Sequence, residues 1–265
     1  MAGDEKIADY WQKVADKLTN QGNYVSIFTQ KDIPSENLNT LNISGTEHDV
    51  RFEKSKDADF HFSYYKKNDD AKIDFFKIEG SALSIDLKKL NLPKNQFKIN
   101  FNFKSDENPS GFIARDVDQA SIVIQVPEKI KNLKIETVSG EIKSNSLNFD
   151  EAIVSSVSGN LKLQGEFKSL YLSTVSGDIK LESGNAEPEA KIETVSGDIK
   201  ISLDRQPGFK LTFNTTSGDV EIAKTIGGGE FEGDVKDLKI GSAAGTLAIS
   251  TVSGDLRIEK IDGTK

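Results

Sequence analysis

The sequence predicts an all-β protein, a β-solenoid or β-helix-like stack of short strands with one α-helix at its N-terminus. A phrase close to T-V-S-G-D occurs six times in the second half of the chain, with glycines at Gly140, Gly159, Gly177, Gly197, Gly218 and Gly254. The steps between these glycines are 19, 18, 20, 21 and 36 residues. A period near 20 residues is typical of solenoids, in which each coil buries its apolar side against its neighbours. Residues 230–235 (EFEGDV) predict a degenerate copy inside the long last step.

Residues 4–19 (DEKIADYWQKVADKLT) have the apolar spacing of a helix, and Asn20-Gln21-Gly22 supplies a stop. The open ends of a solenoid expose apolar surface and unpaired strand edges, so we expect this helix to cap the first coil. The alternative is that the helix docks a partner or a second copy, with Trp11 and Tyr10 as the candidate partner-binding residues.

Short alternating runs follow the helix from Tyr24 to about Val126, rich in β-branched and aromatic residues and separated by Asn, Asp, Gly and Ser. They predict strands and turns. Nine of the fifteen phenylalanines lie between Phe52 and Phe112, so we expect a thicker core here. The chain therefore divides into an N-terminal helix (1–22), aromatic-rich early β coils (23–130) and a regular repeat solenoid (131–265) that continues the early coils.

Alignment of the repeats on their glycines gives apolar columns five residues before the glycine and two and four residues after it. These columns predict the stacked interior, with strand-like alternation. We also expect an inward column two residues before the glycine, with a bulge or bend at the Ser-Gly corner to allow it: Val138, Val157, Val175, Val195 and Val252.

Composition narrows the function classes. The net charge is −8 and the pI is about 5.0, which disfavours a nucleic-acid partner because phosphate binding needs a basic face. The absence of cysteine rules out disulfides, thiolate metal sites and cysteine nucleophiles. No apolar run is long enough for a membrane span, and no secretion signal is evident. We expect an extracytoplasmic location, in the periplasm or at the cell surface, if a signal has been removed, and otherwise a cytoplasmic one.

The segment VPEKIKNLKIETVSGEIKS, followed by repeats of TVSGDIKI, resembles the bacterial putative-adhesin family, also called toast-rack domains. The earlier stretch LNISGTEHDVRFEKSKDADFHF is similar to the opening of such domains, with a degenerate corner at Ser44-Gly45. The resemblance covers about residues 24 to 262 and excludes the N-terminal helix. It implies a β-solenoid from a bacterium, working near the cell envelope, with no established catalytic residues. This chain differs from many relatives in lacking a membrane segment.

An acidic column follows the corner glycines and raises the question of a metal site: Glu141, Asp178, Asp198, Asp219 and Asp255, interrupted by Asn160. Coils stacked at ~4.8 Å would bring neighbouring carboxylates close enough to chelate a hard cation such as calcium. The favoured interpretation is that Asp and Asn side chains bond nearby corner amides, while the lysine column two residues further on neutralises the acids. We therefore expect no metal and no cofactor.

Two other activities are weighed against structural roles. The hydroxyl columns before the glycines suggest an ice-binding face, but satisfying corner amides is the plainer role. Hydrolase or lyase chemistry on polysaccharides needs a defined carboxylate pair, and none stands out. The histidines, His48 and His61, indicate neither a catalytic triad nor a two-histidine metal site.

The sequence thus favours a non-enzymatic, adhesin-like scaffold or binding protein of the cell envelope, which displays repeated charged and hydroxyl columns. The expected partner is an unknown protein or polysaccharide of the envelope, bound without a membrane span in this chain. A carbohydrate-active enzyme on a β-solenoid and a self-assembling structural protein stay open as alternatives.

Overall fold

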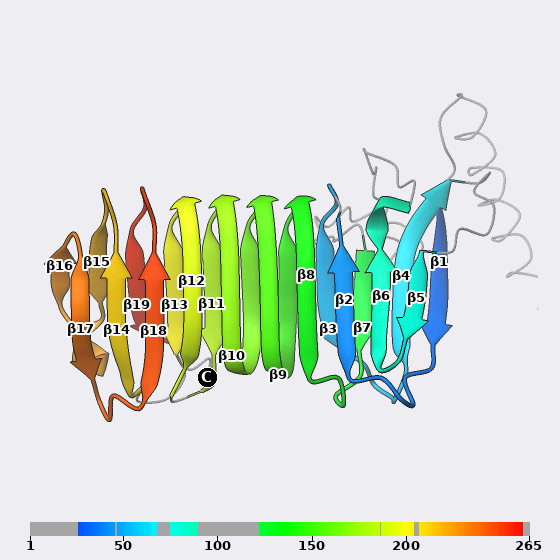
Figure 1. Ribbon diagram of the computed structural model, residues 1–265, viewed down its shortest axis with the longest axis horizontal. Coiled ribbons are helices and arrows are strands. Elements are labelled where there is room, and N and C mark those ends of the chain that lie inside the picture. Colours follow the sequence, from blue (N-terminus) through cyan, green and yellow to red (C-terminus); the bar gives the residue numbers. More distant parts are fainter. Residues whose placement is uncertain are drawn as a thin grey trace, which may run out of the picture.

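The computed structural model describes residues 26–45, 47–67, 75–89, 122–185, 187–203 and 207–261. These ranges form one elongated β stack (Figure 1). The helix expected over residues 4–19 lies outside them, as do Trp11 and Tyr10. Among the described residues the helical elements are two short 3₁₀ turns, η1 (Leu87–Lys89) and η2 (Lys224–Ile226).

Within the described ranges the strands line up in two rows that together form one 19-stranded sheet. The front row in Figure 1 contains, in spatial order, β5 (Phe76–Glu79), β6 (Ala82–Asp86), β2 (Thr40–Ser44), β8 (Asn132–Ser139), the second halves of β9 (Ile142–Ser158) and β10 (Leu161–Ser176), β12 (Glu189–Ser196), β18 (Gly245–Ser250), β14 (Phe209–Asn214) and β17 (Val235–Ile240).

The rear row contains β1 (Ser26–Ile33), β4 (Phe60–Lys67), β7 (Ile122–Val126), β3 (Val50–Lys54), the first halves of β9 and β10, β11 (Ile179–Ser183), β13 (Ile199–Leu203), β19 (Leu256–Lys260), β15 (Asp219–Ile222) and β16 (Glu230–Glu232). A coil is one front strand, the Ser-Gly corner above it and the rear strand that follows. Because β9 and β10 continue from the rear row into the front row, they join the two rows into one hydrogen-bonded structure.

Side chains from both rows fill a narrow interior. The three apolar columns predicted five residues before each glycine and two and four residues after it are all buried, which confirms the stacked interior. Ser144 interrupts the last column. Its hydroxyl accepts a hydrogen bond from the Gln164 amide at 3.1 Å, so the polar group has a partner. The early coils add a cluster of buried phenylalanines, as the sequence predicted: Phe52, Phe60, Phe62 and Phe75.

The spatial order of the coils departs from the sequence order at the C-terminal end. The last coil, β18 and β19, pairs on one side with β12 and β13 and on the other side with β14 and β15. The corner of Gly254 therefore lies between those of Gly197 and Gly218. The corners therefore do not all stack in chain order, because the chain runs to the end of the stack and its last coil then takes a place between two earlier coils.

The segment predicted as a degenerate coil forms an end cap. In residues 230–235, β16 pairs antiparallel with β15, and the following strand β17 pairs antiparallel with β14. An antiparallel strand can follow its partner through a short connection, whereas another parallel coil needs a full turn. The positive φ of Asp237 and a register shift beside Leu211 give β17 an irregular, charged outer edge, which discourages pairing with another molecule.

The N-terminal end has the same out-and-back arrangement. The coil of β2 and β3 lies between the pair β6 and β7 and the coil of β8 and β9. Beyond it, β4 pairs antiparallel with β7, β1 with β4, and β5 with β6. The described part of this end is therefore covered by antiparallel strands. No helix in the described ranges is long and apolar enough to cross a membrane.

Candidate binding surface

The Ser-Gly corners form one long edge of the stack, which we call the corner edge. Along it the amide of Gly159 donates to the Ser176 carbonyl at 3.1 Å, and the amide of Gly177 donates to the Ser196 carbonyl at 3.1 Å. These glycines have φ of 153° and 144°, and a Cβ on Gly177 would collide with the Gly159 carbonyl oxygen. Glycine is required here because the backbones of neighbouring coils approach too closely for any side chain.

The acidic column runs along this edge as a ladder of side-chain to backbone hydrogen bonds. The amide of Asp198 donates to Asp178 Oδ1 at 3.1 Å, that of Asp255 to Asp198 Oδ1 at 3.0 Å, and that of Asp219 to Asp255 Oδ1 at 2.9 Å. Asn160 does the same for the amide of Asp178, at 2.9 Å. The favoured interpretation of these residues as corner amide acceptors therefore agrees with the structure.

Metal binding by this column gains no support. In the part of the chain that the structure describes, no group of three or more His, Asp or Glu side chains is arranged to hold a metal ion. The side chains of Asp178, Asp198 and Asp255 each use one oxygen to accept the backbone amide of the next coil. The low-ranked calcium hypothesis for Asp178, Asp198, Asp219 and Asp255 stays an untested prediction.

The valine column was placed on the wrong side of the strand. The side chains two residues before the glycines are between 47% and 52% exposed, whereas the expectation was an inward column: Val138, Val157, Val175, Val195 and Val252. The hydroxyl residues one position earlier are buried instead, among them Thr137, Thr174 and Thr194. Strict strand alternation continues up to the corner without a bulge, so the inward place falls to the threonine.

Burial of these threonines bears on the ice-binding alternative. A buried column cannot present an ice-binding face. The hydroxyls of Thr137 and Thr174 donate to the carbonyl oxygens of Ser139 and Ser176, at 3.2 and 3.4 Å, so these two bonds satisfy corner carbonyls rather than corner amides. Within the described ranges the hydroxyls of Ser156 and Thr194 have no hydrogen-bond partner.

The basic column pairs with glutamates rather than with the corner aspartates. Lys180 lies 2.6 Å from Glu182 and Lys200 lies 2.7 Å from Glu259. Hydrogen bonding to Lys200 is the main reason that the pKa of Glu259 lies below its usual value. Lys162 pairs with Glu141, so the expected neutralisation by lysine is found at that member of the acidic column. In the described part of the chain Asp178, Asp198, Asp219 and Asp255 make no ion pair, so the expectation is wrong for the four aspartates.

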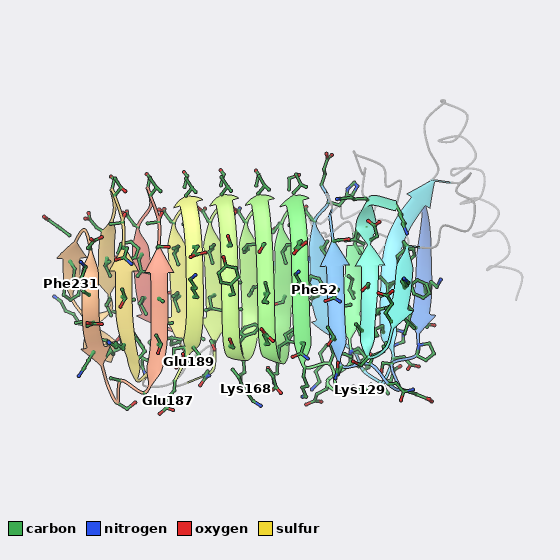
Figure 2. All side chains as sticks on the ribbon, in the orientation of Figure 1. Phe52, Lys129, Lys168, Glu187, Glu189 and Phe231 are labelled. Atoms are coloured by element: carbon green, nitrogen blue, oxygen red, sulfur yellow. The ribbon has the colours of Figure 1, made fainter. Side chains whose placement is uncertain are left out.

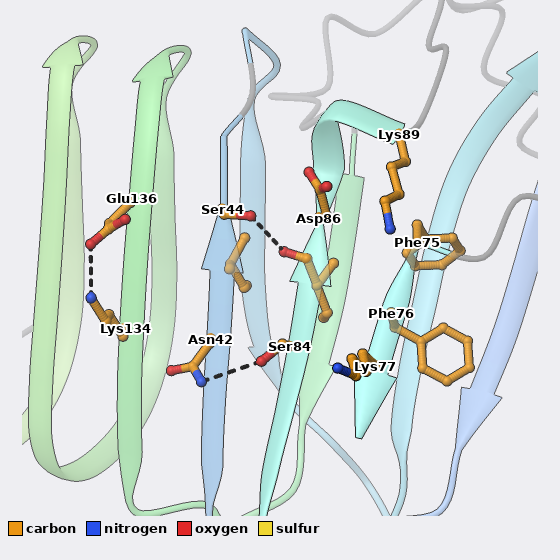
Figure 3. Close-up of a pocket in the computed structure, with 12 residues that line it drawn as sticks. Asn42, Ser44, Phe75, Phe76, Lys77, Ser84, Asp86, Lys89, Lys134 and Glu136 are labelled. Carbon is orange, nitrogen blue, oxygen red and sulfur yellow. Dashed lines mark hydrogen bonds and ion pairs between the residues drawn. The ribbon is translucent and has the colours of Figure 1, made fainter. Parts of the chain in front are cut away.

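An open groove of about 430 Å³ lies on the front row near the N-terminal end, lined by side chains of β2, β5, β6, β8 and η1 (Figure 3). Lys134 and Glu136 form an ion pair of 2.8 Å on one side, while Asp86 and Lys89 stand on the other. The ring of Phe76 flanks the groove, with Lys31 Nζ 3.9 Å from its centroid. A groove of this kind offers a small, mixed-charge binding site with one aromatic wall.

His61 lies at the N-terminal end, where two carboxylates hold it. Its Nδ1 lies 2.7 Å from Asp32 Oδ1, and its Nε2 lies 2.9 Å from Asp57 Oδ1. Hydrogen bonding to Asp32, and then to Asp57, raises the pKa of His61 above its ordinary value of 6.5. Both ring nitrogens are engaged, so His61 links β1, β4 and the preceding loop, as a satisfied strand histidine would.

Sequence reasoning missed both the exposure of the valines and the front groove. One signal could have exposed the first error. In the coil of Gly218 the position of the valine is taken by Thr216, which a buried apolar column would rarely accept. No sequence signal pointed to the groove, because it combines segments as distant as Asn42, Asp86 and Glu136.

The two-row stack with one glycine corner per coil defines a β-solenoid of repeated corners. The sequence comparison agrees. A family model described as Toastrack DUF4097 matches residues 38–165 and 129–259, and the chain belongs to that family. This confirms the resemblance that the repeated corner phrase predicted. The comparison with curated proteins finds no match.

Solved structures resemble this chain at low sequence identity. A putative cell adhesion protein from Clostridium sporogenes is 15% identical with a TM-score of 0.52, and the match covers 89% of this chain and 100% of that one. A putative adhesin from Bacteroides fragilis is 11% identical with a TM-score of 0.35, covering 89% and 97%. A putative lipid binding protein from Parabacteroides distasonis is 13% identical with a TM-score of 0.31, covering 89% and 97%.

Proposed function

We propose that this chain is a non-enzymatic binding scaffold of the bacterial cell envelope, which holds an elongated polymer or protein through many weak contacts. The observation that carries the proposal is the regular display of equivalent side chains, one per coil, along the corner edge and both rows (Figure 2). Contacts that repeat at the ~4.8 Å spacing of the coils suit a long partner, because each contact after the first is intramolecular.

The name of the Clostridium sporogenes structure, a putative cell adhesion protein, is in keeping with such a role. The shape of the surface also supports it, because the front groove is open and shallow. Three untested expectations belong to the same proposal. The location is extracytoplasmic if a signal has been removed and otherwise cytoplasmic, and the chain divides after residues 22 and 130. The N-terminal helix caps the first coil or docks a partner, with Trp11 and Tyr10 as the candidate partner-binding residues.

The experiment compares a polymer with its own fragments. Peptidoglycan sacculi and the monomeric muropeptides released from them are offered to the full chain, and binding is measured by co-sedimentation and competition. We expect the chain to sediment with sacculi, and we expect muropeptides to compete only weakly, because a single unit occupies few coils. Equal affinity for the monomeric fragment would contradict binding through many coils.

A carbohydrate-active enzyme is the second candidate, and the front groove is the observation that favours it. Asp86 and Glu136 supply carboxylates to the groove, and Phe76 supplies an aromatic wall. Retaining and inverting glycosidases need two carboxyl groups about 5 to 10 Å apart, one of them protonated. New reducing ends in the sacculus incubation, lost in the Glu136→Gln variant, would favour this enzyme over the scaffold.

Self-assembly of the stack through its ends is the third alternative, and the structure of the C-terminal end disfavours it. The short strand β16 and the irregular, lysine-bearing strand β17 cover that end of the stack. Light scattering of the full chain is expected to give a monomer mass.

A further inference from the structure

The exposed valines of the corner edge form one continuous feature, which we call the valine ridge: Val138, Val157, Val175, Val195 and Val252. Together with Ile78 they are all of the large apolar side chains that are exposed in the described ranges. Single exposed apolar residues are normal on a protein surface, but a contiguous apolar patch marks an interaction site. Five of these six exposed apolar side chains lie on one edge of the stack, so they form such a patch.

The ridge follows the order of the coils rather than that of the chain. Strands β8, β9, β10, β12 and β18 are parallel neighbours in register, so their valines lie on successive coils. With ~4.8 Å between strands, five coils place the outer valines about 19 Å apart. That length matches three to four turns of an α-helix at 5.4 Å per turn.

A row of carboxylates runs beside the ridge, across the Ser-Gly corner. Its spatial order is Asp178, Asp198, Asp255, Asp219, as the ladder of backbone amides shows. The carboxylates of Asp178, Asp198 and Asp255 each have one oxygen in the ladder, and none of the four aspartates makes an ion pair in the described part of the chain. The nearby Lys180 and Lys200 are paired with glutamates on the rear row.

We propose that the valine ridge and the aspartate row together dock a cationic amphipathic segment of a partner protein, which lays aliphatic side chains on the valines and Lys or Arg side chains beside the aspartates. This inference rests on the proposed role as a binding scaffold and narrows it to one edge and one class of partner. Charge complementarity selects the occupant. A second copy related by symmetry would bring two aspartate rows together, and an anionic membrane surface would be repelled.

The chain itself offers variants that test both halves of the site without disturbing the fold. Thr216 already occupies the ridge position in the coil of Gly218, so Val→Thr at Val157, Val175 and Val195 should be tolerated. Asn160 already occupies the aspartate position and accepts the next amide at 2.9 Å. Asp→Asn at Asp178, Asp198 and Asp255 therefore removes charge and keeps the ladder.

The matched control removes three carboxylates from the opposite edge: Glu151→Gln, Glu187→Gln and Glu189→Gln. These residues are exposed, and Glu187 and Glu189 lie at the lower edge in Figure 2, whereas the corners end the front strands at the upper edge. The control changes the net charge as much as the aspartate variant does. Melting curves of all three variants establish that each is folded.

The probe is a fluorescein-labelled peptide of about 18 residues, with Leu and Lys placed so that a helix has one apolar and one basic face. Binding to the full chain is followed by fluorescence anisotropy. We expect the triple Val→Thr and the triple Asp→Asn variants each to weaken binding about tenfold or more, and the control to stay within about twofold. A peptide of the same composition in scrambled order should bind the wild-type chain as weakly as the amphipathic peptide binds the Val→Thr variant.

Three results would overturn the inference. The first is binding to the Val→Thr variant within about twofold of wild type, which would make the association a matter of charge alone. The second is an equal loss in the opposite-edge control. The third is a dimer in light scattering that the Val→Thr variant abolishes, because the ridge would then be an interface between copies. The sacculus assay separates this inference from the general scaffold role. If the Val→Thr variant still binds sacculi, the scaffold role is retained, and the peptide assay alone tests whether the valine ridge is the docking site.

Discussion

Replacement of one corner glycine tests the packing on which the whole stack depends. Gly197 has φ of 139°, and its amide donates to the Ser253 carbonyl at 3.2 Å. A Cβ at this position would collide with the carbonyl oxygen of Gly177 in the preceding coil. That oxygen belongs to the backbone, so it can yield only if the two coils move apart. The Gly197→Ala variant therefore strains the corner and weakens the contact between coils.

The expected cost has two parts. Backbone strain at a φ that is essentially restricted to glycine costs about 1 to 3 kcal/mol. Separation of the corners weakens at least one backbone hydrogen bond, about 1 kcal/mol, and forces repacking at about 1 kcal/mol or more. We expect Gly197→Ala to lower the free energy of unfolding by about 3 to 5 kcal/mol.

Gly80 supplies the matched control, because it also has a positive φ, 59°, but nothing lies within 4 Å of the place of its Cβ. Gly80→Ala should therefore cost only the backbone term, about 1 kcal/mol. Both variants are measured by urea unfolding followed by far-UV circular dichroism, with a check that the denaturant dependence is unchanged. If Gly197→Ala costs no more than Gly80→Ala, the close approach of the corners does not constrain the stack.

Three further predictions use neighbouring positions of the same coils. Ile192→Ala should cost about 2 to 5 kcal/mol because its side chain is fully buried, whereas Val195→Ala in the same strand should cost less than about 0.5 kcal/mol; urea unfolding compares them. Asp198→Asn should leave the melting temperature unchanged or slightly higher, because it keeps the acceptor for the Asp255 amide and removes a negative charge, whereas Asp198→Ala should lose about 1 kcal/mol with that hydrogen bond. For His61, the raised pKa means a stabilisation that is complete below about pH 6.5 and disappears as the pH rises through the folded-state pKa. Unfolding of wild type and His61→Gln should therefore differ by about 1 kcal/mol near pH 6 and converge once the pH has risen past the folded-state pKa; a difference that does not change with pH would show that His61 acts only by packing.

The fold class and the interior columns could be predicted because solenoid coils repeat the same apolar positions. Ile192 and Ile199 are buried where the repeat alignment placed them. The valines were misplaced because their hydrophobicity was weighed above the two-residue period of the strand. The burial pattern of β12 alternates without interruption up to Thr194, which puts Val195 outside. Where the two signals conflict, the backbone period decides, since a strand cannot turn one side chain inward without a bulge.

The candidate site was visible in the sequence only in part. The aspartate column and its role at the corner follow from residue type and position alone, because short acceptor side chains bond nearby amides. The absence of neutralising lysines could not be inferred. A lysine two residues further along the chain points to the same outer side of the rear row, but a glutamate on that row, such as Glu182 beside Lys180, lies nearer. Ion pairing depends on which columns of side chains are adjacent in space. The alignment of single repeats does not contain that information.

The order of the coils is the feature that local sequence could least determine. Every corner presents the same backbone surface to its neighbours, so the coil of Gly254 fits as well beside Gly197 as the coil of Gly218 would. The coils of Gly218 and Gly254 differ in what pairs with their outer side. Strand β14 is followed by residues that form the antiparallel strands β16 and β17, and these cover the end of the stack. The coil of Gly218 must therefore be terminal, and the last coil takes the only parallel place left between it and Gly197. The equivalent corners allow any coil to stack on any other. The irregular segments between the coils, here those that form β16 and β17, determine the order in which the coils stack.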